Sequence, residues 1–487
     1  MRTPRIAVIG AGISGICMGV ALQRAGFTDL VIYEKADDFG GTWRDNTYPG
    51  LVCDVPSRYY QFTFAPNAQW RHMYSSGPDI QRYLLGVARA QGLHQWTRFG
   101  VEVTGATFDG VRWQVSASDE TVEDFDFVLC ATGFLHHPSW PDIAGLDEFG
   151  GDVMHSARWR HDIELTGARV GVIGTGSTGT QLVGALAGKE AEVVVFQRTP
   201  QWILPTVNRK YTPLSKALYR RAPVLGVASY WFFRAAFAAA SQGLVHPGRM
   251  RRFIQWVVEQ HLRSVRDPEL RRKLTPDYQA MCKRMVVSDS FYRAVQRPDV
   301  TVVTDGIDRV EKRGVVTVDG RLRELDVLVL ATGFDSHAYM RPMAITGLGG
   351  HTLDQAWASG PRAHESVMIP EFPNLFMLIG PHSPVANHPL TAIAEAQSVR
   401  IVGWLRRWRA GEFETVAPTR DATDRYNARM REAAPNTALA TGCRSWYLGA
   451  DGVPEVWPWS PHRYEKLIRS APNPLDYHLT PCPAERK

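Results

Sequence analysis

Two glycine-rich segments of the chain have the spacing that binds the pyrophosphate of a dinucleotide. In the first segment, Gly10 permits a tight turn, Gly12 lets the backbone approach a pyrophosphate, and Gly15 allows a helix to pack closely on a strand. Glu34 lies nineteen residues after Gly15, at the place where a carboxylate accepts hydrogen bonds from ribose hydroxyls. These residue types predict a nucleotide site in the first part of the chain.

The second segment repeats the pattern with one change. It has three glycines at matching positions, Gly174, Gly176 and Gly179, with Ser177 after the second glycine. Nineteen residues after the last glycine the chain carries Arg198, followed by Thr199, instead of an acid. A carboxylate there would repel a 2′-phosphate, whereas a guanidinium binds one through two hydrogen bonds. We therefore expect FAD at the first segment and NADPH at the second. The alternative for Arg198 is an ordinary solvent-exposed arginine at the end of a strand, with no role in binding.

Strands and helices must hold both turns in place. Each glycine segment is predicted to follow a buried strand, to open a helix, and to be followed by a second strand. The predicted strands are 5–9 and 30–33 in the first unit and 170–173 and 192–197 in the second. Two further apolar stretches, 125–134 and 325–334, both end in Ala-Thr-Gly-Phe and predict buried strands that reach a glycine turn. The expected fold is α/β, with two Rossmann-like dinucleotide-binding domains.

Two longer motifs give the chain a resemblance to a known family. The first has the spacing FxGxxxHxxxW and consists of Phe149, Gly151, His155 and Trp159. The second covers residues 41–54 with the spacing GxWxxxxYPGxxxD and includes Gly41, Thr42, Trp43 and Asp54. On these motifs the chain resembles the type I Baeyer-Villiger monooxygenases of the flavin-containing monooxygenase superfamily. Arg160 departs from the proline or aspartate that usually follows the tryptophan.

The resemblance implies roles for several residues. Arg284, in the tripeptide Cys-Lys-Arg, would be the active-site arginine, and Asp54 would position it. Lys283 would be a second contact to the NADPH 2′-phosphate, although a surface basic pair has the same sequence. Gly41, Thr42 and Trp43 would belong to the FAD site. His155 would orient the two nucleotide domains through hydrogen bonds instead of acting as a base.

The reaction implied by the resemblance consumes NADPH and O2. A small-molecule ketone would become an ester or lactone by way of a peroxide on the flavin C4a carbon, in a site that excludes water. The alternative is a flavin-containing monooxygenase that oxygenates nitrogen or sulfur. A reductase built on the same two nucleotide folds would need a redox-active CxxC, which the sequence lacks.

The motifs predict where the chain changes domain. The expected FAD-binding domain consists of residues 1–140 and 331–487, and its last part holds a substrate-pocket segment. The linker with the FxGxxxHxxxW motif is 141–168, and the NADPH-binding domain is 169–330 with a helical insertion at 208–281. An aromatic-rich stretch at 446–459 would either line the substrate pocket or pack in a core.

Composition limits the remaining function classes. The net charge of +6 comes from basic residues spread along 487 residues, which fits anionic cofactors better than nucleic acid. The apolar region 222–240 has twelve residues between Arg221 and Arg234, too few for a membrane span. We expect a buried or lid helix there, with contact at a membrane interface left open. The six cysteines show no metal-ligand spacing, so we expect reduced thiols, no metal and a cytoplasmic protein of undetermined oligomeric state.

Overall fold

The computed structural model describes residues 2–189, 191–383 and 388–482. Its centre consists of two five-stranded sheets in which every pairing is parallel. The first sheet has the order β19-β7-β1-β2-β3 and the second has the order β8-β17-β9-β10-β13. Parallel sheets are covered on both faces, and the strands of both sheets are accordingly apolar and largely buried. The predicted α/β fold with two Rossmann-like domains is confirmed.

The two sheets are built in the same way. The strands of the first are β1 (Ile6–Ile9), β2 (Leu30–Glu34), β3 (Thr97–Phe99), β7 (Phe127–Cys130) and β19 (Leu375–Met377). Those of the second are β9 (Arg169–Ile173), β10 (Glu192–Phe196), β13 (Val300–Val303), β17 (Val327–Leu330) and β8 (Asp152–His155). The predicted strands before and after each glycine turn are therefore present, and both Ala-Thr-Gly-Phe segments follow the strand that pairs with the first strand of their unit.

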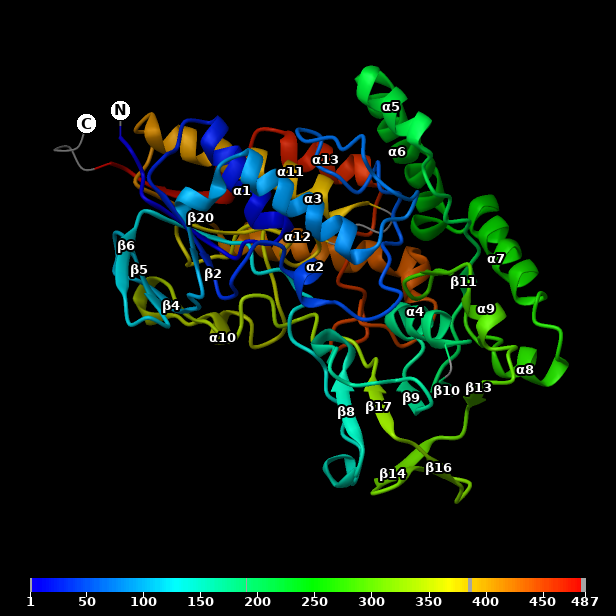
Figure 1. Cartoon of the computed structure of the whole chain (residues 1–487). Coiled ribbons are helices and arrows are strands. Elements are labelled where there is room, and N and C mark those ends of the chain that lie inside the picture. The colour runs from blue at the N-terminus through cyan, green and yellow to red at the C-terminus, as the bar shows by residue number, and fades with distance from the viewer. Residues whose placement is uncertain (1, 190, 384–387, 483–487) are drawn as a thin grey trace.

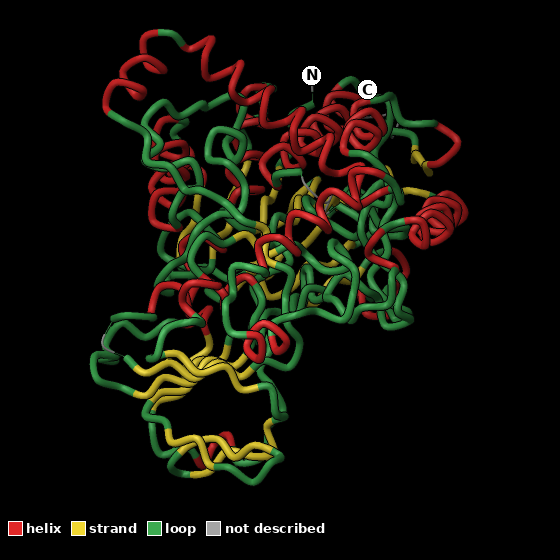
Figure 2. Tube along the Cα trace, turned by 90° about the vertical axis from the view of Figure 1, so that its right-hand side faces the viewer, coloured by secondary structure: helices red, strands yellow, loops and turns green. Residues whose placement is uncertain are grey.

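Each unit also carries a small antiparallel insertion at the same point of its topology. Between β3 and β7 the chain forms β4 (Val103–Phe108), β5 (Trp113–Ala117) and β6 (Val122–Phe125), which β18 (Ala344–Thr346) joins. Between β13 and β17 it forms β14 (Ile307–Glu311), β15 (Gly314–Thr317) and β16 (Leu322–Glu324). Figure 2 shows the second insertion below the strands of its parent sheet. Two short pairs complete the strands: β11 (Ile203–Leu204) with β12 (Val286–Val287), and β20 (Thr415–Pro418) with β21 (Tyr477–Thr480).

Helices surround the two sheets. Those of the first body are α1 (Ile13–Arg24), α2 (Thr42–Asp45), α3 (Gly77–Ala90), α10 (Leu353–Ala356), α11 (Leu390–Arg409), α12 (Arg420–Ala433) and α13 (Pro461–Arg469). Those of the second are α4 (Ser177–Leu186), α5 (Pro213–Arg221), α6 (Pro223–Val245), α7 (Arg249–Leu262), α8 (Pro268–Lys273) and α9 (Phe291–Ala294). Helix α11 returns to the first body late in the chain and packs on α1, so the first body is assembled from both early and late parts of the sequence.

Helix α6 lies where an apolar helix is predicted but differs in burial. It has 23 residues, continues to Val245 beyond the predicted region 222–240, and projects from the molecule together with α5 (Figure 1). Only 11% of its most apolar window is buried, so of the two expected alternatives, a buried helix or a lid helix, the buried one is wrong. Within the described ranges α6 is the one helix that is long and apolar enough to cross a membrane, judged by length and composition alone. The apolar composition of a helix does not indicate which of its sides is exposed to solvent.

One cysteine pair also differs from expectation. Cys282 and Cys443 form a disulfide with a Cα–Cα distance of 6.0 Å, whereas we expected all six thiols to be reduced. Because the two residues are 161 positions apart, no spacing rule links them. The disulfide joins the segment that carries Lys283 and Arg284 to the aromatic-rich stretch near the C-terminus.

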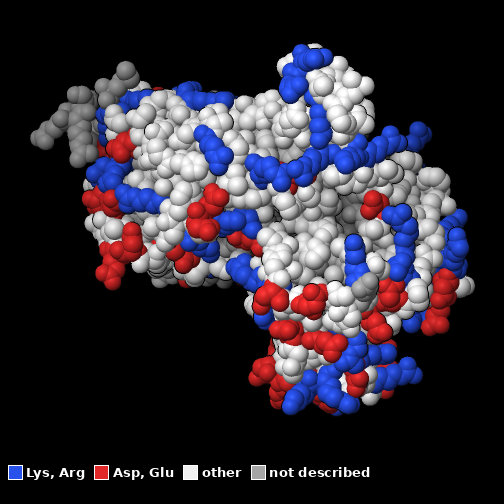
Figure 3. Space-filling model, in the orientation of Figure 1, with Lys and Arg blue, Asp and Glu red and all other residues white. Residues whose placement is uncertain are grey.

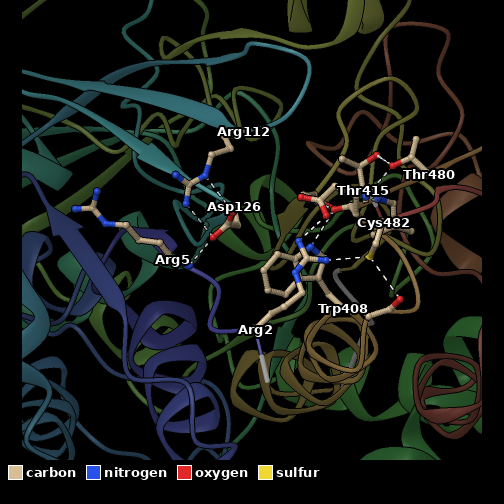
Figure 4. Close-up of polar contacts among 12 residues, drawn as sticks. Arg2, Arg5, Arg112, Asp126, Trp408, Thr415, Thr480 and Cys482 are labelled. Atoms are coloured by element: carbon tan, nitrogen blue, oxygen red, sulfur yellow. Dashed lines mark hydrogen bonds and ion pairs between the residues drawn. The ribbon is translucent and has the colours of Figure 1, made fainter. Parts of the chain in front are cut away.

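The two ends of the chain are held side by side. The guanidinium of Arg2 lies 3.9 Å from the ring centroid of Trp408 and donates a hydrogen bond to the Cys482 sulfur at 3.0 Å (Figure 4). The backbone N–H of Arg5 donates to Asp126, which also accepts from Arg112 (Figure 4). These contacts fix the entry to β1, the central strand of the first sheet.

Candidate active site

One cavity of about 720 Å³ lies between the two nucleotide-binding units. Both glycine turns, both Ala-Thr-Gly-Phe segments and the Asp54–Arg284 pair contribute to its wall. Of the predicted site residues, the lining includes Gly10, Gly12, Glu34, Gly41, Thr42, Trp43, Asp54, Gly176, Ser177 and Arg284. The topology explains this arrangement, because both turns follow the carboxyl ends of parallel strands, where ligands of open α/β sheets bind.

The first turn has the geometry of a pyrophosphate cradle. Gly10 has a φ of +102°, which disfavours any residue with a side chain. A Cβ atom on Gly15 would lie 1.8 Å from the Gly10 carbonyl oxygen, so only glycine lets α1 approach β1 this closely. Helix α1 has Gly12 as its N-cap, with no side-chain cap and no acid in its first turn. Its free N–H groups suit an anion.

The second turn repeats these contacts. Gly174 has a φ of +111°, and a Cβ on Gly179 would lie 2.0 Å from the Gly174 oxygen. Gly176 caps α4, again with no side-chain cap and no acid in the first turn. A Cβ on Gly176 would meet nothing within 4 Å. The space beside this helix end is therefore open, as a bound pyrophosphate requires.

Glu34 is buried and already makes several contacts. It accepts hydrogen bonds from the N–H groups of Ala11 at 2.8 Å and Ala36 at 3.0 Å, and Arg44 lies 3.1 Å away. A carboxylate has about four lone-pair sites, so one remains for a ribose hydroxyl. We did not predict Arg44, although it follows Trp43 in the GxWxxxxYPGxxxD motif.

Asp54 and Arg284 come from different units and meet in the cavity wall. Arg284 Nε and Nη2 donate to Asp54 Oδ2 at 3.0 and 2.7 Å, and Nη2 also reaches Oδ1 at 2.9 Å. The charge of Asp54 raises the pKa of Arg284 above its usual value, so the guanidinium stays protonated. The Arg284 side chain remains 47% exposed, and it faces the cavity. The pair therefore presents a fixed positive group to whatever fills this space.

Arg198 and Lys283 lie outside the cavity lining. Arg198 is exposed just after β10, and the Thr199 carbonyl accepts a hydrogen bond from Thr175 in the second glycine turn. The pKa of Lys283 is lowered, first by burial and then by the charge of Arg198. Two cations that repel each other beside the second turn are an arrangement that an anionic phosphate would stabilise.

The FxGxxxHxxxW motif supports the join between the units. Phe149 is buried, and a Cβ on Gly151 would lie 2.2 Å from the Asp326 oxygen, next to β17. His155 is fully buried, accepts a hydrogen bond from the Ala157 N–H at 3.1 Å and touches Phe334, a cavity residue. Burial lowers the pKa of His155, so the ring is neutral. Trp159 packs against the core of the second unit.

The sequence did not predict what the YPG part of the second motif contacts. Tyr48 donates to Gln181 Oε1 at 2.9 Å, and Gln181 donates to the Val52 carbonyl at 2.8 Å. Gly50 lies against the Gln181 backbone, where a Cβ would come within 2.6 Å of the carbonyl oxygen. The YPG segment is thus a contact between the units. In the aromatic-rich stretch, Trp446 lines the cavity whereas Trp457 packs in the core.

The described part of the chain has no cluster of three or more His, Cys, Asp or Glu side chains that could hold a metal ion.

Comparisons with known proteins agree with this geometry. Residues 3–342 match the family model described as flavin-binding monooxygenase-like. The chain belongs to this family. The match includes both glycine turns, the FxGxxxHxxxW motif and the Asp54–Arg284 pair. Membership confirms the predicted class, a flavoprotein monooxygenase.

Individual relatives of this flavin-binding monooxygenase cover almost its full length. A Baeyer-Villiger monooxygenase of Streptomyces coelicolor is 38% identical over 492 residues, which cover 99% of this chain and 94% of that protein. An uncharacterized monooxygenase of Mycobacterium tuberculosis is 54% identical over 478 residues, 98% of this chain and 96% of that protein. The crystal structure of OTEMO in complex with FAD and NADP has a TM-score of 0.88 and 27% identity, and covers 98% of this chain and 100% of that chain.

Proposed function

We propose that this flavin-binding monooxygenase catalyses a Baeyer-Villiger oxidation. It uses NADPH and O2 to insert one oxygen atom beside the carbonyl of a ketone and yields an ester or lactone. The observation that carries the proposal is the Asp54–Arg284 pair, which projects from two units into the cavity that both nucleotide turns line. The resemblance to a Baeyer-Villiger monooxygenase over 99% of the chain supports it.

The two nucleotide units fit FAD and NADPH. We assign FAD to Gly10, Gly12, Gly15, Glu34 and the segment Gly41-Thr42-Trp43, with Asp54 at its edge. We assign NADPH to a second set of residues: Gly174, Gly176, Ser177, Gly179, Arg198, Thr199 and Lys283. The support is physical: both helix N-termini lack a side-chain cap, the space beside Gly176 is open, and Arg198 and Lys283 lie near each other beside the second turn.

Bound FAD would supply the redox chemistry, by accepting hydride from NADPH and activating O2. The residues of the chain supply a positive charge and exclude water from the cavity. Arg284 keeps its proton and offers several donors in fixed geometry to negative charge that develops in the cavity. Asp54 holds the guanidinium in one orientation through two donors. Trp43 and Trp446 add apolar wall that excludes water.

The substrate class is tested directly with products. Purified protein with FAD, NADPH and O2 is incubated with cyclic, linear and aryl ketones and with a thioether, and the products are identified by mass spectrometry. We expect esters or lactones that are about 16 mass units heavier than the ketones, because one oxygen atom is added. Sulfoxide formation without any ester from the whole ketone panel would contradict the proposal.

We also propose that the reaction takes place in the cytoplasm.

A further inference from the structure

The outward surface of α6 is apolar from Val224 to Ala239. The exposed residues of this part recur at helical spacing: Val224, Val227, Ala228, Trp231, Phe232, Ala235, Ala236 and Ala239. Gln242 follows them on the same side. Residues three or four apart share one side of a helix, so these eight form a continuous stripe, which we call the α6 face. Trp231 is 57% exposed and Phe232 is 68% exposed. Soluble proteins seldom leave such a patch without a partner.

The charge around the α6 face has one sign. Residues 193–258 contain no Asp or Glu and ten Lys or Arg. The exposed basic residues of this stretch include Arg209, Lys210, Arg220, Arg221, Arg249 and Arg252. In Figure 3 the projecting α5–α6 segment is a white surface edged with blue. An apolar stripe on a stretch of chain whose only charged side chains are cations fits a partner that is apolar inside and anionic at its surface.

We propose that the α5–α6 projection docks on the surface of a membrane that contains anionic phospholipids. The α6 face enters the boundary between headgroups and acyl chains, where Trp and Phe side chains are favoured. The flanking Lys and Arg side chains contact lipid phosphates, and the lack of carboxylates on this stretch leaves that attraction unopposed.

The inward side of α6 shows that the helix lies along the membrane and does not cross it. Tyr230 and Phe237 both pack on Tyr59, with ring centroids 5.3 and 5.5 Å apart. Arg234 donates to Glu465 at 2.6 Å. The helix is about 35 Å long, enough to span a bilayer, but spanning would break these contacts and leave Arg234 in hydrocarbon. Docking of the outward side alone preserves them.

Vesicle flotation of the full-length FAD-loaded protein tests the proposal. Vesicles of phosphatidylcholine are compared with vesicles of phosphatidylcholine mixed with phosphatidylglycerol. We expect binding to the anionic vesicles, weaker binding to phosphatidylcholine alone, and release by salt, because salt screens exposed charges. The double variant Trp231→Ser, Phe232→Ser should lower vesicle affinity about tenfold or more, because two aromatic anchors are lost. Arg220→Gln with Arg221→Gln should lower binding to anionic vesicles only.

Matched controls separate docking from general surface effects. Leu475→Ser removes an apolar side chain elsewhere that is even more exposed, and Arg313→Gln removes an exposed cation of the small β14–β16 sheet. Both should float like the wild type, and NADPH oxidation in solution should be unchanged in every variant. A folded wild type that fails to float with anionic vesicles overturns the proposal. A Trp231→Ser, Phe232→Ser variant that floats as well as the wild type also overturns the proposal. The same holds if the wild type does not bind vesicles but sediments as a dimer that this double variant abolishes.

Discussion

Arg284 stands 230 positions from Asp54 in the sequence, yet three short contacts join the two side chains. The guanidinium keeps its charge because the carboxylate raises its pKa. Because the pair connects the two units at the cavity wall, it is where chemistry should be most sensitive to a single change.

We predict that Arg284→Ala still binds FAD and oxidises NADPH but forms little ester. Loss of one preorganised donor group typically costs roughly 100- to 1,000-fold in rate, and the unused oxygen should leave as hydrogen peroxide. Ester yield and peroxide per NADPH consumed are the measurements. Arg309→Ala, which removes an equally exposed arginine paired with Asp308 and Glu311, is the control. Near wild-type ester yield in Arg284→Ala would remove the proposed role.

We predict that Arg198→Ala weakens NADPH binding about ten- to a hundredfold and leaves NADH binding unchanged. The estimate follows from the roughly 1.5–3 kcal/mol of a hydrogen bond to a charged group. KM values for both nucleotides check it, and Lys283→Ala is measured in parallel. If only the Lys283 variant loses the preference for NADPH, the 2′-phosphate contact belongs to that residue.

Some residues of the site could be predicted and others could not, for a physical reason. Gly10, Gly15 and Glu34 belong to a local strand-turn-helix pattern, so spacing alone places them. Arg44 beside Glu34, and the link between Cys282 and Cys443, depend on contacts across the fold. No short-range pattern encodes these.

At the scale of elements, the two helices that start at the glycine turns can be tested by a matched pair of alanines. Gly176→Ala adds a Cβ that meets no protein atom within 4 Å, whereas Gly179→Ala places one 2.0 Å from the Gly174 oxygen. We predict that Gly176→Ala keeps the thermal stability of the wild type but loses NADPH affinity. Gly179→Ala should lose stability, by about 1–3 kcal/mol, because the backbone must move apart.

Thermal unfolding without ligand and NADP titration of each variant separate the two effects. If Gly176→Ala binds NADP as tightly as the wild type, the open space beside α4 does not hold the pyrophosphate.

The four strands predicted around the glycine turns matched their observed positions to within one residue at each end, because apolar periodicity and glycine spacing act locally. Helix α6 matched its predicted region but not the predicted burial. Burial depends on what packs on each side of a helix, and in α6 the inward side around Tyr230 and the end near Leu244 are packed, whereas the outward side is exposed.

For the whole molecule, buried histidines predict how stability depends on pH. Burial lowers the pKa of His136, His364 and His382 from 6.5 to about 4. Between these values the unfolded chain takes up protons that the folded protein does not, so the free energy of unfolding should fall as the pH drops from about 6.5 to 4. His337 works in the opposite direction, because Glu455 raises its pKa.

Denaturant unfolding across this pH range measures the effect. His364→Gln cannot titrate and should reduce the slope by up to about 1.4 kcal/mol per pH unit, the value for one proton. If the dependence of the free energy of unfolding on pH is the same in this variant as in the wild type, His364 does not contribute to it through a lowered pKa.

The two nucleotide units repeat each other even in their closest contacts. A Cβ atom added to Gly10 or Gly174 would lie 2.7 or 2.5 Å from the carbonyl oxygen of Ala131 or Ala331. The units differ where their second strands end, with Glu34 in the first unit and Arg198 just after β10 in the second. Because Arg198 lies outside the cavity wall, we expect substitutions at this position to change the preferred nicotinamide reductant without changing the shape of the cavity.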